Sequence, residues 1–258
     1  VISRARGRSS KLIIRLSVKT INGYKAIARK GKTAQEIFIS NEKSLDSEGF
    51  EVLLLALPGL VLVALVGFVD DIWPLDWRFR LFAHTAAAGY VLYALGIDVL
   101  GVDDPESQLR LLTNLSAVFG LVWLLNLYNF MDGIDGIASV ETLSIGLGIT
   151  LLAGTVDWQP LGQYQALVLA GAAVGFLWWN WSPAKVFFGD VGSVPLGFLL
   201  GWLLLNLAGH GFWAAAIILP LYYLVDATLT LLERLARGEK IWEAHRSHYY
   251  QQAVQKGL

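Results

Sequence analysis

A polar peptide interrupts the apolar sequence near its middle, and it carries the side chains best suited to chemistry. It reads Asn126-Leu-Tyr-Asn-Phe-Met-Asp-Gly-Ile-Asp-Gly-Ile-Ala138. Amide or carboxylate side chains recur at every third position, at Asn126, Asn129, Asp132 and Asp135, so neighbouring members would lie close together on a helical face. The glycines between them allow close approach of a ligand, although Asp-Gly pairs also form ordinary turns. Polar groups at the end of an apolar segment are costly unless they face water, a metal or a polar substrate.

Further carboxylates follow other apolar segments. Asp70 and Asp71 are adjacent, and paired carboxylates at a membrane interface need a metal, Lys or Arg nearby to stay charged at low cost. Asp190 lies between glycines. Together with Asp132 and Asp135, these residues supply oxygen ligands for Mg²⁺, which usually combines one or two carboxylates with water and substrate phosphate oxygens. The pattern predicts metal-assisted phosphoryl transfer, whereas the simpler interpretation is a set of solvated caps and turns.

Basic and amide side chains close to these acids could bind a phosphate-containing substrate. Arg80 follows the aspartate pair, and Asn180 and Lys185 precede Asp190. The polar C-terminal segment contains His245-Arg246-Ser247-His248 among other basic residues. Two histidines three positions apart could bind zinc, but no third or fourth ligand of the right type stands nearby. We therefore expect this segment to bind an anion such as a diphosphate.

The composition indicates a membrane protein. Of the 258 residues, 55% are apolar, compared with about 45–50% in ordinary soluble domains. Apolar runs of roughly 16–21 residues have the length needed to cross a hydrocarbon layer of about 30 Å. We predict seven spans, at residues 52–69, 81–100, 111–130, 138–156, 164–179, 194–208 and 212–232. Because the backbone in lipid must satisfy its own hydrogen bonds, these spans predict an all-α integral membrane protein, a polytopic helical bundle. The chain has no cysteine, which excludes disulfides and thiolate chemistry.

The polar stretches and the basic residues predict the same topology. Two predicted spans separate each polar stretch from the next, so all of them should emerge on one membrane face. Eight of the nine Lys and Arg residues after position 50 also lie on that face. Because basic residues favour the cytoplasmic side, we predict that the face with the motifs is cytoplasmic.

Residues 1–50 differ from the rest of the chain. They hold eleven of the 20 Lys and Arg residues and show no clear periodicity, as in a basic arm that is disordered or bound to a surface. Basic residues without interleaved aromatic side chains support nucleic-acid binding only weakly, so no nucleic-acid partner is expected. A single span after residue 50 would place this segment outside the cell, against the charge rule. We therefore interpret residues 1–50 as a basic polar segment that is non-native or incomplete.

Four motifs occur together in residues 52–252. They are Val66-Gly-Phe-Val-Asp-Asp71, the peptide 126–138, Pro183-Ala-Lys-Val-Phe-Phe-Gly-Asp-Val-Gly-Ser193 and His245-Arg-Ser-His-Tyr-Tyr-Gln251. In order and spacing, this set resembles the polyprenyl-phosphate N-acetylhexosamine-1-phosphate transferases, the glycosyltransferase 4 family that includes the phospho-MurNAc-pentapeptide translocase. The resemblance makes residues 51–258 a transmembrane phosphosugar transferase domain with cytoplasmic loops.

The resemblance also implies a reaction and its setting. An N-acetylaminosugar-1-phosphate would pass from a UDP-sugar to undecaprenyl phosphate with release of UMP, in the bacterial plasma (inner) membrane. Mg²⁺ is the implied cofactor, with Mn²⁺ as an alternative, and a homodimer is compatible with the family. The Arg-Ser insertion between the histidines is more similar to the branch that initiates O-antigen or capsule synthesis, while the motifs do not predict which sugar is transferred.

Roles for individual positions follow from the same resemblance. Asp70, Asp71, Asp132 and Asp135 are the expected catalytic residues, with Asp70 deprotonating the lipid phosphate. Asp190 is the expected metal ligand, helped by Asp132. The expected substrate-binding residues are Asn129, Asn180, Arg80, Lys185, His245, Arg246 and His248.

Two alternatives remain at this stage. Residues 1–50 lack the Thr-Pro-Arg-Gly-Gly-Gly-type loop of the family, and the chain ends soon after the histidine motif, so a truncated, inactive relative is the first alternative. The second is a secondary transporter, which would also bury carboxylates among helices. Its ionisable groups should lie near the middle of the membrane, often with internal repeats, whereas here the aspartates cluster at span ends and the sequence shows no repeat.

Overall fold

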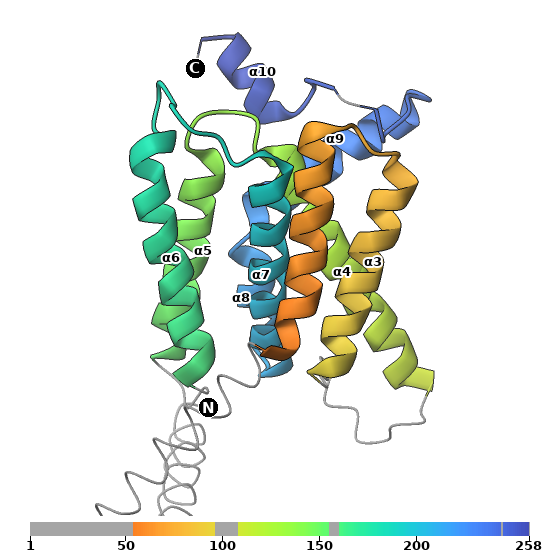
Figure 1. The fold of residues 1–258 in the computed structure, drawn as a ribbon, viewed down its shortest axis with the longest axis vertical. Helices are drawn as coiled ribbons and strands as arrows, with labels where there is room; N and C mark the ends of the chain where they lie inside the picture. Colours follow the sequence, from red (N-terminus) through yellow and green to blue (C-terminus); the bar gives the residue numbers. More distant parts are fainter. Residues whose placement is uncertain (1–53, 96–107, 155–159, 244, 258) are drawn as a thin grey trace, which may run out of the picture. The chain divides into compact units, whose positions relative to one another are not determined.

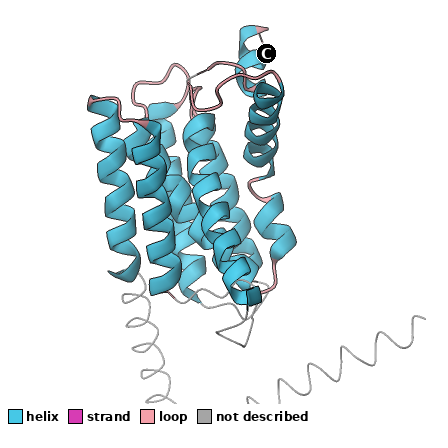
Figure 2. Ribbon diagram, turned by 90° about the vertical axis from the view of Figure 1, so that its right-hand side faces the viewer, coloured by secondary structure: helices cyan, strands magenta, loops and turns pink. Residues whose placement is uncertain are grey.

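The computed structural model describes residues 54–95, 108–154, 160–243 and 245–257, which are helices joined by loops, with no β-strand among them (Figures 1 and 2). The predicted all-α fold is therefore confirmed for this part of the chain. In chain order the helices are Leu54–Ile72, α3 (Trp77–Ala94), α4 (Gln108–Met131), α5 (Ile137–Ala153), α6 (Pro160–Asn180), α7 (Gly189–Gly209), α8 (Trp213–Ile218), α9 (Leu221–Ala236) and α10 (Tyr249–Gln255). The predicted segment 1–50 lies outside the described residues.

Within the described ranges, three helices are long and apolar enough to cross a membrane: Leu54–Ile72, α4 and α7. α5 is apolar but only 17 residues long. Each predicted span contains helical residues, because long apolar runs bury side chains best when the backbone bonds to itself. That all seven cross a membrane stays a prediction.

The last predicted span, 212–232, is not one continuous helix. α8 ends at Ile218 and α9 begins at Leu221, with Pro220 in the turn between them. Proline lacks a backbone N–H, and its ring collides with the carbonyl group four residues earlier. The Pro220 carbonyl instead accepts a hydrogen bond from the Leu224 N–H at 3.0 Å, in the first turn of α9. The predicted span 212–232 is therefore helical on both sides of a turn at Pro220.

α7 is the most enclosed of the three long apolar helices. In its most apolar stretch 61% of the residues are buried, against 44% in α4 and 28% in the Leu54–Ile72 helix. Phe198 and Leu200 of α7 are fully buried, as are Leu125 and Leu127 of α4. The bundle is therefore organised around the α4–α7 pair.

The polar loops gather at one end of the bundle. Those that follow the Leu54–Ile72 helix, α4, α6 and α9 all lie at the end that also holds α10 (Figure 1). Counting spans in the sequence predicts this shared end, and it brings the acidic and basic motifs within reach of one another.

Glycines allow α4 and α7 to approach closely. A Cβ atom at Gly197 would lie 2.7 Å from the Tyr128 Cβ and 2.8 Å from the Leu125 Cα, and one at Gly201 would lie 2.6 Å from the Leu121 side chain. Small residues permit such backbone contact between helices in membranes. The close packing of α7 against α4 therefore depends on having no side chain at Gly197 and Gly201.

We predict that Gly197→Ala destabilises the bundle. Overpacking typically costs about 1–3 kcal/mol, and here the obstacle is partly the α4 backbone, which cannot rotate away. Thermal unfolding in detergent should show a lower Tm. Gly171→Ala in α6 is the matched control, because a Cβ there meets nothing within 4 Å. A Tm for Gly197→Ala equal to that of Gly171→Ala would contradict the close contact.

Candidate active site

The end of the Leu54–Ile72 helix lies against the start of α7. A Cβ atom at Gly67 would lie only 2.5 Å from the Asp190 carbonyl oxygen and 2.9 Å from the Val191 nitrogen. Because Gly67 is one turn before Asp70 and Asp71, this contact places the aspartate pair beside Asp190. Two motifs more than 100 positions apart thus meet at one point.

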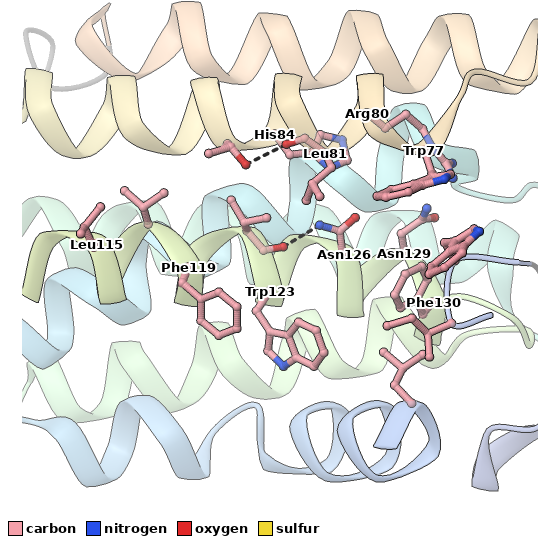
Figure 3. Close-up of a pocket in the computed structure, with 16 residues that line it drawn as sticks. Trp77, Arg80, Leu81, His84, Leu115, Phe119, Trp123, Asn126, Asn129 and Phe130 are labelled. Carbon is pink, nitrogen blue, oxygen red and sulfur yellow. Dashed lines mark hydrogen bonds between the residues drawn. The ribbon is translucent and has the colours of Figure 1, made fainter. Parts of the chain in front are cut away.

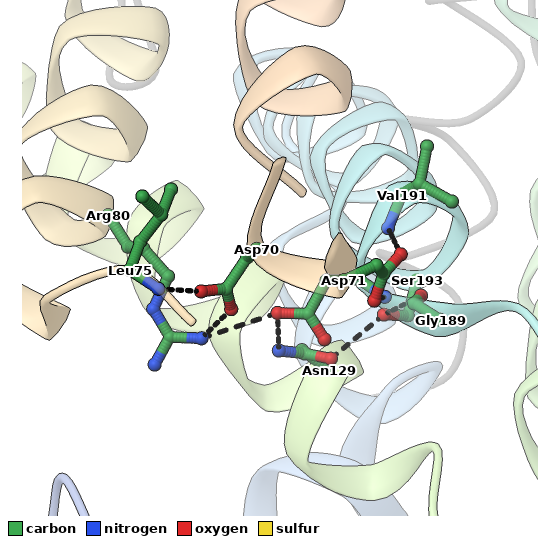
Figure 4. A network of polar contacts seen from close by, with 9 residues as sticks. Asp70, Asp71, Leu75, Arg80, Asn129, Gly189, Val191 and Ser193 are labelled. Carbon is green, nitrogen blue, oxygen red and sulfur yellow. Dashed lines mark hydrogen bonds and ion pairs between the residues drawn. The ribbon is translucent and has the colours of Figure 1, made fainter. Parts of the chain in front are cut away.

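Asp71 binds the first turn of α7. Its two carboxylate oxygens accept hydrogen bonds from the Asp190 N–H at 2.9 Å and the Val191 N–H at 3.0 Å (Figure 4). These backbone N–H groups have no partner within the helix, and a carboxylate at a helix N-terminus is favourable. The structure thus gives Asp71 a positioning role, while its predicted catalytic role stays a prediction.

Arg80 lies between Asp70 and Asp190. Its Nη1 forms an ion pair with Asp70 Oδ2 and lies 3.3 Å from Asp190 Oδ2. Asp70 Oδ1 also accepts a hydrogen bond from the Leu75 N–H at 2.6 Å. Both oxygens of Asp70 are therefore engaged, and one guanidinium group partly balances two carboxylates.

Asn129 connects α4 to the same point. Its side-chain NH₂ donates to Asp190 Oδ2 at 3.1 Å, and its side-chain oxygen accepts from the Ser193 hydroxyl at 2.9 Å (Figure 4). Ser193 lies one turn after Asp190 in α7. Sequence reasoning did not single out Ser193, although a spacing of three on a helix places it on the same face as Asp190. We call Asp70, Asp71, Arg80, Asn129 and Asp190 the aspartate network.

Asp132 follows directly after α4, near the aspartate network. Burial, with the negative charge of Asp190 as a further cause, raises the pKa of Asp132 to about 7. Among the described residues, none donates a hydrogen bond that lowers this pKa. Two half-buried carboxylates close together, one without a donor, form a site that a cation would stabilise.

The residues present fit a hard divalent cation. Asp132 and Asp190 offer carboxylate oxygens, which Mg²⁺ prefers. The described ranges contain no group of three or more His, Cys, Asp or Glu residues that could hold a metal. The protein would therefore contribute one or two carboxylates and leave the other positions to water and substrate phosphate, as Mg²⁺ commonly requires.

Asp135 and Asn180 tie two loops together. Asp135 Oδ2 accepts a hydrogen bond from the Ala184 N–H at 2.9 Å. Asn180 is only 3% exposed; its oxygen accepts from the Gly136 N–H at 3.1 Å, and its NH₂ donates to the Val186 carbonyl at 2.9 Å. The structure thus uses both side chains to hold the α4–α5 and α6–α7 loops in register. Their predicted roles in catalysis and nucleotide binding stay predictions.

Lys185 is exposed in the α6–α7 loop. Its Nζ lies 5.9 Å from the centroid of the Trp179 ring, within the range of a cation–π contact. The cation remains accessible at the polar end of the bundle, so it is available to an anionic ligand.

The histidine motif reaches the central peptide through Tyr250. The Tyr250 hydroxyl donates to the Phe130 carbonyl at 3.0 Å, two positions before Asp132. His245 is half-buried, Arg246 is exposed and His248 is only 2% exposed. Among the described residues, no hydrogen bond joins the histidines to the aspartate network, so this motif contacts the site from one side.

Comparison with known proteins shows the family of this chain. The sequence pattern of the family described as glycosyl transferase family 4 matches residues 53–208, from the start of the Leu54–Ile72 helix almost to the end of α7. The chain belongs to this family. The resemblance predicted from the motifs is therefore confirmed, and the matched residues contain the whole aspartate network.

Two relatives carry the same name. Phospho-N-acetylmuramoyl-pentapeptide-transferase from Streptococcus pneumoniae (strain CGSP14) is 31% identical over 209 residues, which cover 74% of this chain and 62% of the relative. The protein of that name from Streptococcus pneumoniae (strain ATCC 700669 / Spain 23F-1) gives the same identity and coverage. The chain thus spans less than two thirds of the length of these curated relatives.

We predict that Asp71→Ala loosens the start of α7. Losing an N-terminal cap costs about 0.5–2 kcal/mol, and the released N–H groups should exchange faster. Hydrogen exchange measured by mass spectrometry on peptides covering residues 189–193 would detect this.

Asp76→Ala is the matched control for this measurement. The Asp76 side chain caps α3 by accepting from the Arg78 N–H at 2.8 Å. Its loss should destabilise α3 without changing exchange in α7. Equal exchange of residues 189–193 in Asp71→Ala and the unmodified protein would exclude the capping role.

Proposed function

We propose that this protein transfers an N-acetylaminosugar-1-phosphate from a UDP-sugar to undecaprenyl phosphate and releases UMP. The observation that carries the proposal is the convergence of Asp70, Asp132, Asp190 and Arg80 at one end of a helical bundle. Membership of glycosyl transferase family 4 supports it. The proposal places the site at the cytoplasmic face of the bacterial plasma membrane, in the initiation of a cell-envelope polysaccharide of the O-antigen or capsule kind.

A groove beside the aspartate network supports a lipid acceptor. It has a volume of about 510 Å³ and lies between α3 and α4, with Ile241 and Trp242 also in its wall. Phe119 and Trp123 form part of its apolar side, while Arg80 and Asn129 lie toward its other end (Figure 3). A polyprenyl chain would fit the apolar part and bring its phosphate to Arg80.

The reaction requires little covalent chemistry from the protein itself. An oxygen of the lipid phosphate attacks the β-phosphorus of the UDP-sugar, a new P–O bond forms, and the bond to UMP breaks, with the electron pair leaving on UMP. Such reactions depend on positioning and charge stabilisation. Asp190 and Asp132 would hold Mg²⁺, or Mn²⁺ in its place, which neutralises the donor diphosphate when bound. Arg80 would orient the acceptor phosphate.

Asp70 fits a positioning role better than that of a general base. A phosphate monoester has a second pKa near 6, so the acceptor is already largely ionised at neutral pH. Asp70 also has both oxygens occupied, by Arg80 and by the Leu75 N–H. We therefore assign Asp70 to holding Arg80 in place.

The test is release of UMP by purified protein supplied with a panel of UDP-N-acetylaminosugars, undecaprenyl phosphate and Mg²⁺. UMP release should require both the lipid and the divalent cation. Asp190→Ala should lower it by at least about 10²-fold, the scale on which loss of transition-state charge stabilisation acts. Glu243→Gln, an exposed change at the same end of the bundle, should leave it unchanged. Failure to release UMP with any donor would favour the inactive relative.

The pH dependence of Asp70→Asn separates positioning from proton transfer. If Asp70 positions Arg80, turnover should fall by roughly 10²-fold, the cost of a misplaced group, and by the same factor from pH 6 to pH 9. Recovery of the unmodified rate at and above pH 7, where the acceptor is already largely ionised, would instead assign Asp70 as the base.

A further inference from the structure

Asp226 in α9 organises the histidine motif. It is 3% exposed and accepts hydrogen bonds from the Tyr249 N–H at 3.0 Å and the Tyr250 N–H at 2.9 Å. It also lies 3.3 Å from His248 Nδ1 and 3.3 Å from the Thr230 hydroxyl. One buried carboxylate therefore holds the start of α10 and the ring of His248.

The contact with Asp226 fixes the proton on His248. The carboxylate already accepts two backbone N–H groups, and an ionised carboxylate cannot donate, so Nδ1 of His248 must carry the hydrogen. Burial lowers the pKa of His248, which agrees with a neutral ring at pH 7. A neutral imidazole has one N–H, so Nε2 of His248 carries no proton.

His245 is held in the opposite arrangement. Its Nδ1 accepts from the Ser247 N–H at 3.4 Å and lies 2.9 Å from the Ser247 hydroxyl. A backbone N–H can only donate, so the proton of the neutral ring is on Nε2. Burial, with the charge of Arg234 as a further cause, lowers the pKa of His245 to about 4, so the ring is neutral at pH 7.

The two rings lie against each other. Their centroids are 4.7 Å apart and their planes are inclined by 30°, and the centroid of the Tyr250 ring lies 5.8 Å from that of His248. His248 is buried between these neighbours, whereas His245 is the more exposed of the pair. Only His245 is therefore placed to meet a ligand, and its available nitrogen is a hydrogen-bond donor.

We infer that Asp226 is a positioning residue that holds the two histidines in opposite tautomers, so that His248 supports the ring of His245 and His245 presents its Nε2–H to the donor diphosphate. The ligand in this inference rests on the proposed function, since the diphosphate is that of the UDP-sugar. The assignment of the two tautomers does not depend on the proposed function. Asp226 acts through His248, because at 3% exposure it does not reach a substrate.

The first test reads the tautomers directly and needs no activity. The chain has four histidines, so ¹⁵N-histidine labelling gives a simple long-range ¹H–¹⁵N spectrum, in which His245→Gln and His248→Gln assign the two signals. At pH 7 the unmodified protein should show His245 protonated at Nε2 and His248 at Nδ1. In Asp226→Ala the acceptor for Nδ1–H is lost, so His248 should no longer be held in the Nδ1–H form. The same tautomer in both histidines of the unmodified protein, or an unchanged His248 in Asp226→Ala, would overturn the inference.

The second test reads the ligand. Asp226→Ala should raise the KM for the UDP-sugar by about tenfold or more, the scale of a lost charge-assisted hydrogen bond, and leave the KM for undecaprenyl phosphate unchanged. Glu233→Ala is the matched control: Glu233 also lies in α9 and contacts Tyr249 through the tyrosine hydroxyl, but it does not touch the histidines. Equal effects of the two substitutions on the KM for the UDP-sugar would show that Asp226 only stabilises the start of α10. If the unmodified protein releases no UMP, the proposed function fails while the tautomer measurement still decides the inference.

Discussion

The active end of this bundle depends on one contact, the carboxylate of Asp71 on the first N–H groups of α7. The absence of a side chain at Gly67 lets two helices approach closely enough for this contact to form, and the contact then fixes the direction in which Asp190 leaves the helix. Arg80 and Asn129 contact Asp190 at this position. Close packing of the two helices thus determines how the charged side chains at their ends are arranged.

Charge balance explains why so many acids can share this place. Asp70 and Asp190 are both within reach of Arg80, so one guanidinium offsets part of their repulsion. Asp132 has no such partner among the described residues, and its raised pKa reflects burial and the charge of Asp190. A divalent cation supplied with the substrate would complete the balance.

The sequence predicted the parts of the structure that depend on contiguous residues. Lengths of apolar runs predicted the helices, and counting them predicted that the motifs share one end. The sequence could not predict which of two similar adjacent residues makes which contact, because tertiary packing decides this. Nothing local distinguishes Asp70 from Asp71, yet one binds Arg80 and the other caps α7. Asn180 likewise suggests a ligand contact in sequence, while in the fold its amide is used by two loops.

The aspartates of this site fall into two groups once their hydrogen-bond donors are compared. Those that accept backbone N–H groups are Asp70, Asp71, Asp135 and Asp226. Backbone donors stabilise the charged form locally, so these residues can shape the site without a metal. Among the motif aspartates in the described residues, Asp132 and Asp190 alone show no hydrogen bond from a backbone N–H. The fold thus leaves the pair proposed to hold Mg²⁺ without backbone donors, and this division, more than the number of acids, separates a binding site from an acidic surface.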